Sequence, residues 1–196
     1  MWIDDRRDEA ITAFEKALSI DPDNYEALFH AGRFFETIGN FETAAVHYTR
    51  ATEVRPDDYQ APIRLSEALF SLQRPETARQ YTQIGIKRAQ EALRLHPENS
   101  RPAQLGAAAF ARIGEKEKAK AWLSLAIEID PDDNHMRYNA ACTYAQLGEI
   151  DLSLDMLTLW IEKAGGNLLM WFQTDPDLEP IRNDPRYAKL LNRTNS

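Results

Sequence analysis

The stretch Tyr25–Asp58, YEALFHAGRFFETIGNFETAAVHYTRATEVRPDD, is the template for this protein, because most of the remaining chain can be aligned to it position by position. Small and apolar residues recur every three or four positions on both sides of Gly39, and the pattern ends at Pro56. This spacing is typical of amphipathic helices, a glycine readily adopts the left-handed conformation that ends a helix, and a proline cannot donate the next backbone hydrogen bond. The stretch therefore predicts a helical hairpin whose second helix runs from about Glu42 to Val54. Asp23 followed by Glu26 predicts a capping box at the start of the first helix.

The hairpin is repeated along the chain. Pro22 and Pro56 are 34 residues apart, and so are Pro97 and Pro131. Small residues stand where the two helices of each hairpin would cross: Gly32, Ser66, Ala107 and Ala141 in first helices, and Ala10, Ala44, Ala78 and Ala119 in second helices. With this period of ~34 residues the chain resembles the tetratricopeptide repeat (TPR) family. The resemblance implies an all-α fold, a solenoid of helical hairpins in a right-handed superhelix with C-terminal capping helices.

The template divides the chain into six segments. The third repeat is longer than the others, because Pro97 follows Pro56 by 41 residues instead of 34. Seven extra residues make almost two helical turns, so its second helix is expected to run from about Glu76 to Leu95. The expected segments are residues 1–24, a partial N-terminal repeat that holds only the second helix; 25–58, a repeat; 59–99, a repeat with the extended second helix; 100–133 and 134–166, two further repeats; and 167–196, a C-terminal cap.

The first segment lacks most of the helix against which its own helix should pack. A repeat buries its apolar face only against its neighbours. We therefore expect that the chain is cut from a longer protein or that this edge is covered by another subunit. The alternative is a lone helix acting as an N-terminal cap. Trp2 and Phe14 are the candidate oligomer surface, and a homodimer is one expected partner arrangement.

The repeat pattern decays towards the C-terminus. Ser153 and Trp160 stand in alanine columns, and Gly165-Gly166 replaces the terminating proline. We expect a short apolar helix at Leu168–Phe172 and a last amphipathic helix carrying Tyr187, Leu190 and Leu191. These features predict that residues 167–196 close the array.

A second resemblance concerns the biological setting. The long helix, the stretches HPENSRPAQLGAAAFARIGEKEKAKAWLSLAIEIDPDD and YNAACTYAQLGE, and the ending DPDLEPIRNDPRYAKLL together resemble the C-terminal TPR region of bacterial signalling proteins. Especially similar are those with a class III adenylate or guanylate cyclase domain upstream, and similar tails follow winged-helix DNA-binding domains. The resemblance implies a regulatory or partner-binding role. No cyclase catalytic residue can be carried over, because no part of the chain matches a catalytic domain.

Composition limits the classes of partner. The net charge of −8 disfavours attraction of the whole chain to nucleic acid or to an anionic membrane. The sequence has no apolar run of about 18 residues and no signal peptide, so we expect no membrane partner for this chain. The single cysteine, Cys142, excludes an internal disulfide framework and fits a reducing compartment. The predicted location is the cytoplasm.

The candidate binding site is the concave groove. In the TPR arrangement, the second, fifth, sixth, ninth, twelfth and thirteenth residues of each first helix line this groove. The resulting candidates are Phe29, His30, Arg33, Ile63, Arg64, Phe70, Arg101, Gln104, Arg112, His135, Tyr138 and Asn139. Four arginines and two histidines stand against few acids, chiefly Glu26, Glu36 and Glu67. We predict that the groove binds an acidic or carboxylate-ended protein segment, with arginines donating to its carboxylates and aromatic residues supplying apolar contact. The alternative is that these charges are solvated or paired within the chain.

The groove differs from one known carboxylate clamp. TPR domains that bind the C-terminal tails of heat-shock chaperones use lysine and asparagine at the fifth and ninth positions of one repeat, asparagine at the sixth position of the next, and then lysine and arginine. Here the second repeat offers Phe29 and Arg33, the third Arg64 and the fourth Arg101. The clamp pattern is absent, so we expect at most an analogous carboxylate site.

The sequence indicates no enzymatic chemistry. The aspartate clusters flank terminating prolines, where helix caps are needed, and the four histidines lack zinc-type spacing. Cys142 has no histidine base beside it in the helical pattern, and no glycine-rich phosphate loop, G-x-S-x-G or H-E-x-x-H occurs. We therefore predict no catalytic residue, cofactor or metal. The expected function is a non-catalytic protein-protein interaction scaffold in a signalling protein. The alternative is a homo-oligomerisation module that brings attached catalytic, cyclase-like or DNA-binding domains together.

Overall fold

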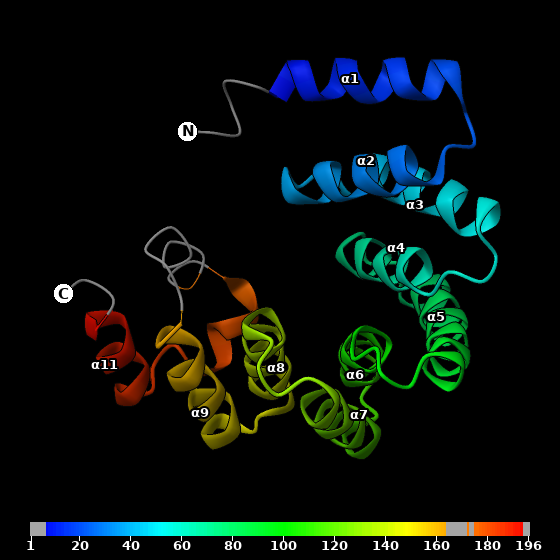
Figure 1. Cartoon of the computed structure of the whole chain (residues 1–196). Coiled ribbons are helices and arrows are strands. Elements are labelled where there is room, and N and C mark those ends of the chain that lie inside the picture. Colours follow the sequence, from blue (N-terminus) through cyan, green and yellow to red (C-terminus); the bar gives the residue numbers. More distant parts are fainter. Residues whose placement is uncertain (1–6, 164–171, 173–174, 194–196) are drawn as a thin grey trace. The chain divides into compact units, whose positions relative to one another are not determined.

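The computed structural model describes residues 7–163, residue 172 and residues 175–193. These residues form helices and no strand, as Figure 1 shows, which confirms the predicted all-α class. The chain divides into two compact units, residues 1–91 and 92–196.

The first unit is built from helices that pack in the order of the sequence. Helix α1 packs on α2, α2 packs on α3 and α3 packs on α4 (Figure 1). Its helices are α1 (Arg7–Ile20), α2 (Tyr25–Thr37), α3 (Phe41–Val54), α4 (Gln60–Ser71) and α5 (Pro75–Leu95), the last of which crosses into the second unit.

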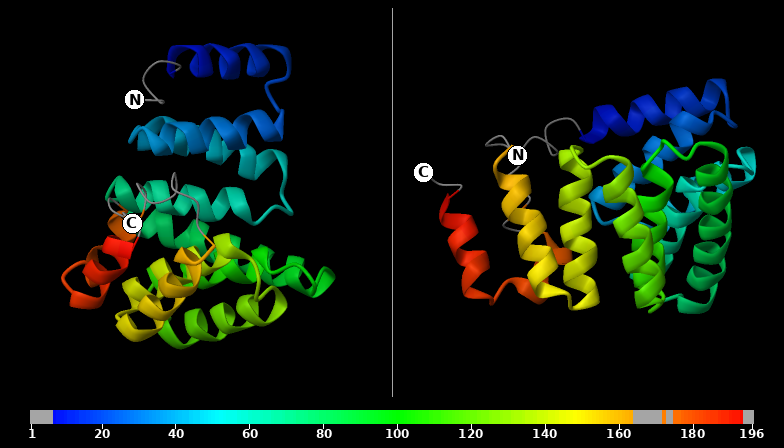
Figure 2. Two further views of the ribbon diagram at one scale, coloured as in Figure 1. Left: turned by 60° about the vertical axis from the view of Figure 1, so that its left-hand side comes forward. Right: turned by 60° about the horizontal axis from the view of Figure 1, so that its bottom comes forward.

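The second unit contains two further hairpins and the C-terminal elements. Helix α6 packs on α7 and α8 packs on α9, while α8 also contacts α6, α7 and η2, and α11 lies against α9 (Figure 2). Its elements are α6 (Arg101–Arg112), α7 (Lys116–Ile129), α8 (Asn134–Leu147), α9 (Ile150–Ile161), the 3₁₀ helix η2 (Pro176–Ile181) and α11 (Pro185–Arg193).

The turn between the helices of a hairpin needs a left-handed residue. Gly39 follows α2 with φ 77°, as the sequence predicts. Gln73 occupies the corresponding place after α4 and adopts the same region with φ 57°. This conformation is strained for a residue with a side chain, so the third repeat forms its hairpin at a conformational cost.

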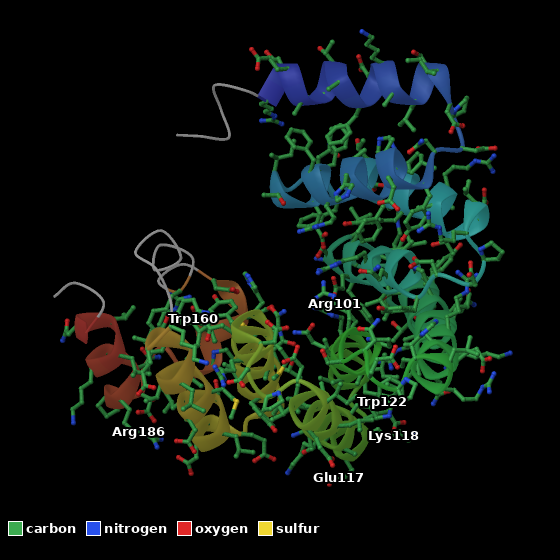
Figure 3. All side chains as sticks on the ribbon, viewed as in Figure 1. Arg101, Glu117, Lys118, Trp122, Trp160 and Arg186 are labelled. Atoms are coloured by element: carbon green, nitrogen blue, oxygen red, sulfur yellow. The ribbon has the colours of Figure 1, made fainter. Side chains whose placement is uncertain are left out.

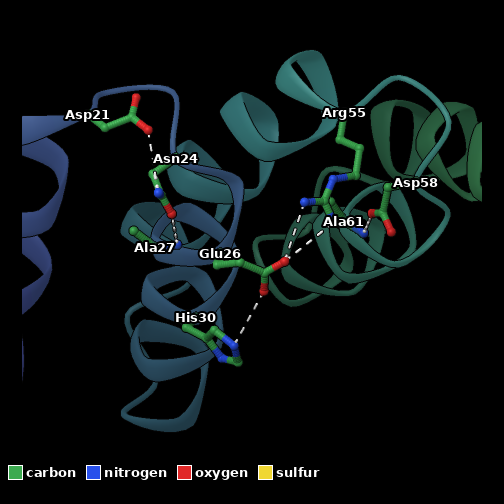
Figure 4. Close-up of polar contacts among 8 residues, drawn as sticks. All are labelled: Asp21, Asn24, Glu26, Ala27, His30, Arg55, Asp58 and Ala61. Atoms are coloured by element: carbon green, nitrogen blue, oxygen red, sulfur yellow. Dashed lines mark hydrogen bonds and ion pairs between the residues drawn. The ribbon is translucent and has the colours of Figure 1, made fainter.

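The predicted capping box at Asp23 and Glu26 is wrong. Helix α2 begins at Tyr25, so its N-cap is Asn24, whose side-chain oxygen accepts a hydrogen bond from the backbone N–H of Ala27 at 3.0 Å (Figure 4). Asp23 instead accepts a hydrogen bond from Nε of Arg50 at 2.8 Å. A capping box would require Asp23 to be the N-cap, but the helix starts one residue later and Asn24 caps it.

The crossing point of the α2–α3 hairpin shows why small residues recur there. A Cβ atom added to Gly32 would lie 2.6 Å from Cε1 of Tyr48, which is fully buried. The Tyr48 hydroxyl leaves this core and donates to Glu36 at 2.8 Å. Two alanines of the second-helix column in this unit, Ala44 and Ala78, are also fully buried.

The long helix of the third repeat is present as predicted. Helix α5 has 21 residues, whereas α3 and α7, the second helices of the neighbouring repeats, have 14 residues each. The seven additional residues match the excess in proline spacing. Its Gly85 packs against Ile63 of α4, since a Cβ added there would meet the Ile63 side chain.

The C-terminal elements share a core with the last hairpin. Trp160 of α9 is buried, with its ring centroid 4.8 Å from that of Tyr138 and 5.8 Å from that of Phe172. Ser153, the other residue that replaces an alanine, is fully buried and donates to the carbonyl oxygen of Ala141 at 2.8 Å. The same core contains Leu178 and Ile181 of η2, and Tyr187 and Leu190 of α11.

Several sequence expectations fall on residues outside the described part. Trp2, Gly165-Gly166 and most of the short helix expected at Leu168–Phe172 lie there. Phe14 is described and half-buried, and its ring centroid lies 5.7 Å from that of Phe34 on α2. Among the described residues, no helix combines the length and the apolar character needed to cross a membrane.

Candidate peptide-binding surfaces

The predicted groove residues are divided between the two units. Those of the first unit form the α2–α4 surface: Phe29, His30, Arg33, Ile63, Arg64 and Phe70. Those of the second unit form the α6–α8 surface: Arg101, Gln104, Arg112, His135, Tyr138 and Asn139.

The apolar residues of the α2–α4 surface mostly belong to the core. Phe29 is 8% exposed, and its ring stacks on that of Tyr25 with centroids 5.7 Å apart. Ile63 is fully buried against α5. Phe70 is half-buried and packs on the same core. Phe29 and Ile63 therefore stabilise the unit and are not accessible to a ligand in this structure.

Arg64 is paired within its own helix. Its Nη1 lies 2.8 Å from Oε2 of Glu67, and the two side chains are 29% and 12% exposed. The carboxylate of Glu67 raises the pKa of Arg64 further above its ordinary value, although burial opposes this change. The nearby Glu36 acts in the same direction. Arg64 is therefore neutralised by carboxylates of the chain itself.

Arg33 has different surroundings. Its side chain is exposed on α2, and no hydrogen bond or ion pair joins that side chain to another residue of the described part. His30, one turn earlier, is also exposed, and its Nε2 lies 3.8 Å from Glu26 (Figure 4). Glu26 also lies 3.4 Å from Arg55, whose guanidinium stacks over the Tyr25 ring. Within the described residues, the free cation of the α2–α4 surface is thus Arg33.

On α6, the predicted residues interact with one another. Nη1 of Arg101 donates to Oε1 of Gln104 at 2.8 Å, and Gln104 is 4% exposed. Figure 3 shows Arg101 on α6, along with Trp122 on α7 and Trp160 on α9. Arg112, at the last turn of α6, is half-buried. The polar groups of α6 are therefore at least partly satisfied within the unit.

The α8 part of the surface is covered by the chain itself. The Tyr138 hydroxyl donates to Oδ2 of Asp175 at 2.7 Å, and Nε2 of Gln146 donates to Oδ1 of Asp177 at 2.6 Å. Leu178 and Ile181 of η2 are fully buried beside these contacts. His135 remains exposed and Asn139 is half-buried. An acidic segment of the chain thus lies on the helix face that the sequence assigns to ligand binding.

Asp175 and Asp177, which form this contact, were not among the predicted site residues. The stretch DPDLEP lies within the predicted cap, and a six-residue 3₁₀ helix shows no helical periodicity from which a partner could be inferred. Gln146 is at the thirteenth position of the fifth repeat, a groove position, and this signal could have identified it.

Cys142 lies beneath the same segment. Its Sγ and carboxylate oxygens of Asp175 and Asp177 all lie within 4.8 Å of one another. Burial, reinforced by the two carboxylates, raises the pKa of the Cys142 thiol. A protonated thiol is a poor nucleophile and a poor metal ligand, and both aspartates already accept hydrogen bonds from α8. We therefore assign neither catalysis nor a metal to this cluster.

Comparison with known families agrees with the helical architecture. Models described as tetratricopeptide repeat match residues 5–47, 37–84 and 104–133, together more than half of the chain. The chain therefore belongs to the tetratricopeptide repeat family. Proteins of this class are generally non-catalytic scaffolds that bind other proteins or peptides.

Individual proteins resemble this chain in fold or in sequence. The structure of TTC0263, a thermophilic TPR protein of Thermus thermophilus, has a TM-score of 0.66 and 26% identity, covering 97% of this chain and 93% of that one. PilW, a type IV pilus biogenesis factor, has a TM-score of 0.60 and 17% identity, covering 94% and 83%. The DnaJ homolog subfamily C member 7 homolog of Schizosaccharomyces pombe (strain 972 / ATCC 24843) is 22% identical over 215 residues, which cover 97% of this chain and 44% of that protein. This chain thus spans less than half the length of that curated relative.

Proposed function

We propose that this protein is a non-catalytic interaction scaffold whose α2–α4 surface binds an acidic or carboxylate-ended segment of a partner protein through Arg33. The observation that carries the proposal is the difference between two arginines of this surface. Arg64 is held by Glu67, whereas Arg33 is exposed and has no partner in the described part of the chain. A planar guanidinium with free donors is well suited to bidentate binding of a carboxylate.

The rest of the surface supports the same ligand chemistry. His30 lies one turn before Arg33 and is exposed, so both side chains point away from the core at neighbouring positions of α2. Of the nearby acids, Glu36 accepts from Tyr48 and Glu26 lies by Arg55. The negative charges around Arg33 are therefore engaged with other groups of the chain.

The test measures binding of an acidic probe. A fluorescein-labelled peptide EDDELD with a free C-terminal carboxylate is titrated with the protein and followed by fluorescence anisotropy. Arg33→Glu is expected to weaken binding by about tenfold or more, because a hydrogen bond to a charged group contributes ~1.5–3 kcal/mol.

Arg79→Glu is the matched control. Arg79 is exposed on α5 and undergoes the same change of charge at a site outside the α2–α4 surface. This variant should bind the probe as the unmodified protein does. Equal weakening by both variants, or no binding by the unmodified protein, would show that the α2–α4 surface is not a carboxylate site.

Homo-oligomerisation through α1 is the second candidate function. Helix α1 has no buried residue, and Ile20 at its end is 77% exposed. The test is the molar mass in solution by light scattering over a range of concentrations. A dimer that becomes monomeric on Phe14→Glu, but not on Arg33→Glu, would support this function. A monomer at every concentration would exclude it.

The proposed cellular setting is the cytoplasm, in a bacterial signalling protein with a cyclase-like or DNA-binding domain attached. This setting rests on the sequence resemblance of residues 20–192 alone. Co-purification of the natural full-length protein with a cyclase activity would test it.

A further inference from the structure

We propose that the face of α8 formed by Tyr138, Cys142 and Gln146 is a second peptide-binding site, selective for a short segment with two aspartates, one residue apart, followed directly by leucine. In this structure, residues 175–181 occupy the site as an internal ligand. A partner that carries such a segment competes with it. This proposal shares one assumption with the proposed function, namely that the first helices of TPR hairpins bind segments of other proteins.

The residues of the site form one stripe on α8. Tyr138, Cys142 and Gln146 are spaced four residues apart and therefore lie on the same side of the helix. They occupy the fifth, ninth and thirteenth positions of the repeat, which are among the positions that line the groove in the TPR arrangement. The bound segment thus lies where a separate peptide would be expected to bind.

The polar contacts provide selectivity for the two aspartates. Tyr138 donates to Asp175 at 2.7 Å and Gln146 donates to Asp177 at 2.6 Å, so the first and last residues of the stripe each hold one carboxylate. The second oxygen of Asp175 accepts from the backbone N–H of Asp177 at 2.9 Å, which fixes the turn between the two aspartates. Both donors of the stripe are neutral, so α8 holds the carboxylates through a hydroxyl and an amide.

The apolar contacts provide the anchors. Leu178 and Ile181 are fully buried in a core that also contains Ala141, Ala145 and Leu157 of the last hairpin. Exposed Glu179 and Pro180 lie between these two buried side chains, as in a peptide that binds through anchors.

Covalent attachment explains why a free peptide would compete weakly with the intact protein. A tethered segment acts at an effective concentration of about 1 mM or more, so the site is occupied unless the internal contacts are weakened. The site becomes measurable when the two aspartates of the internal segment are removed.

The first experiment measures binding of a fluorescein-labelled peptide DPDLEPIRND to the full chain carrying Asp175→Ala and Asp177→Ala. We expect this double variant to bind the peptide at least about tenfold more tightly than the unmodified protein does. A peptide with both aspartates replaced by alanine should not bind. The matched control is Asp57→Ala with Asp155→Ala, which removes the same charge at two exposed positions and should leave binding at the level of the unmodified protein.

The second experiment uses the single cysteine as a reporter. Cys142 is 7% exposed in contact with the segment, so its reaction with a disulfide reagent measures displacement of residues 175–181. The rate should rise by about tenfold or more in the Asp175→Ala, Asp177→Ala variant and fall again when the peptide is added. Should that variant fail to fold by circular dichroism, Tyr138→Phe removes one donor while keeping the ring, and its thiol should also react faster than that of the unmodified protein.

The outcomes separate this proposal from the function proposed for Arg33. Arg33→Glu should leave binding of DPDLEPIRND to the double variant unchanged, even if it abolishes binding of EDDELD. The proposal is overturned if the folded double variant binds the peptide no better than the unmodified protein. It is also overturned if neither the double variant nor Tyr138→Phe accelerates the thiol reaction.

Discussion

Arg64 and Glu67 form an ion pair across one turn of α4, with Nη1 and Oε2 2.8 Å apart and only 12% of the Glu67 side chain exposed. This pair makes Arg64 part of the structure of the first unit. Arg33, which has the same chemistry but is exposed on α2, remains available for a partner. The electrostatics of the surface therefore depend on which arginines the chain itself neutralises.

Replacement of Arg64 by alanine should destabilise the protein. Glu67 loses its arginine donor in a largely buried position, and we expect the free energy of unfolding to fall by about 1–3 kcal/mol. Arg33→Ala should change it by no more than about 0.5 kcal/mol, because the side chain is exposed and unpaired in the described residues. Urea unfolding followed by circular dichroism measures both. Equal effects would show that the Arg64–Glu67 pair does not stabilise the fold.

Gly32→Ala should also destabilise the protein, although alanine is the better helix former by ~1 kcal/mol. The added Cβ would lie 2.6 Å from the Tyr48 ring, and overpacking of a core costs typically ~1–3 kcal/mol. In a double-mutant cycle with Tyr48→Leu, the second substitution should relieve part of the cost. Additive effects of the two substitutions would contradict the predicted contact.

Asn24→Ala should weaken the start of α2. The substitution removes the side-chain acceptor for the N–H of Ala27, and loss of an N-cap costs about 1 kcal/mol. Asp23→Ala removes only an exposed pair with Arg50 and should cost less than about 0.5 kcal/mol. Thermal unfolding of the two variants distinguishes the positions. The opposite ranking would restore the capping-box interpretation.

The stability of the first unit should depend on pH through His47. Burial lowers the pKa of His47 below its ordinary value of 6.5, and its ring stacks on that of Phe35 with centroids 5.5 Å apart. As the pH falls through 6.5, the unfolded chain therefore binds more protons at this residue than the folded chain does. The free energy of unfolding should decrease from pH 6.5 down to the lowered pKa and then level off for this group.

The measurement compares urea midpoints at about pH 7.5 and about pH 5 for the unmodified protein and His47→Gln. The variant should lose less stability on acidification, because the other titrating groups are common to both proteins. An identical pH dependence would mean that His47 does not contribute to it.

Much of the fold could be predicted from local patterns. The left-handed turn at Gly39 and the 21 residues of α5 both follow from the spacing of glycines, prolines and apolar residues. These features depend on interactions within a few residues along the chain. The capping box failed because a shift of one residue at the start of a helix changes the cap, and the sequence offered acceptors at Asp23 and Asn24.

The candidate sites were less predictable. Groove positions from the repeat pattern included Phe29 and Ile63, which are buried, and Arg64, which is paired. A repeat pattern assigns a position to a face of a helix, but the exposure of its side chain depends on neighbours that the pattern does not specify.

An array of helical hairpins follows from the repeat pattern alone, because a period of 34 residues repeats the same local choices of helix, turn and crossing residue. Which groove side chains are free and which are occupied depends on how the folded chain packs. The bond between Tyr138 and Asp175 joins residues 37 positions apart, and it forms only because folding of the C-terminal segment onto α8 buries Leu178 and Ile181. Such long-range choices depend on shape and burial in three dimensions, which no short-range pattern in the sequence records.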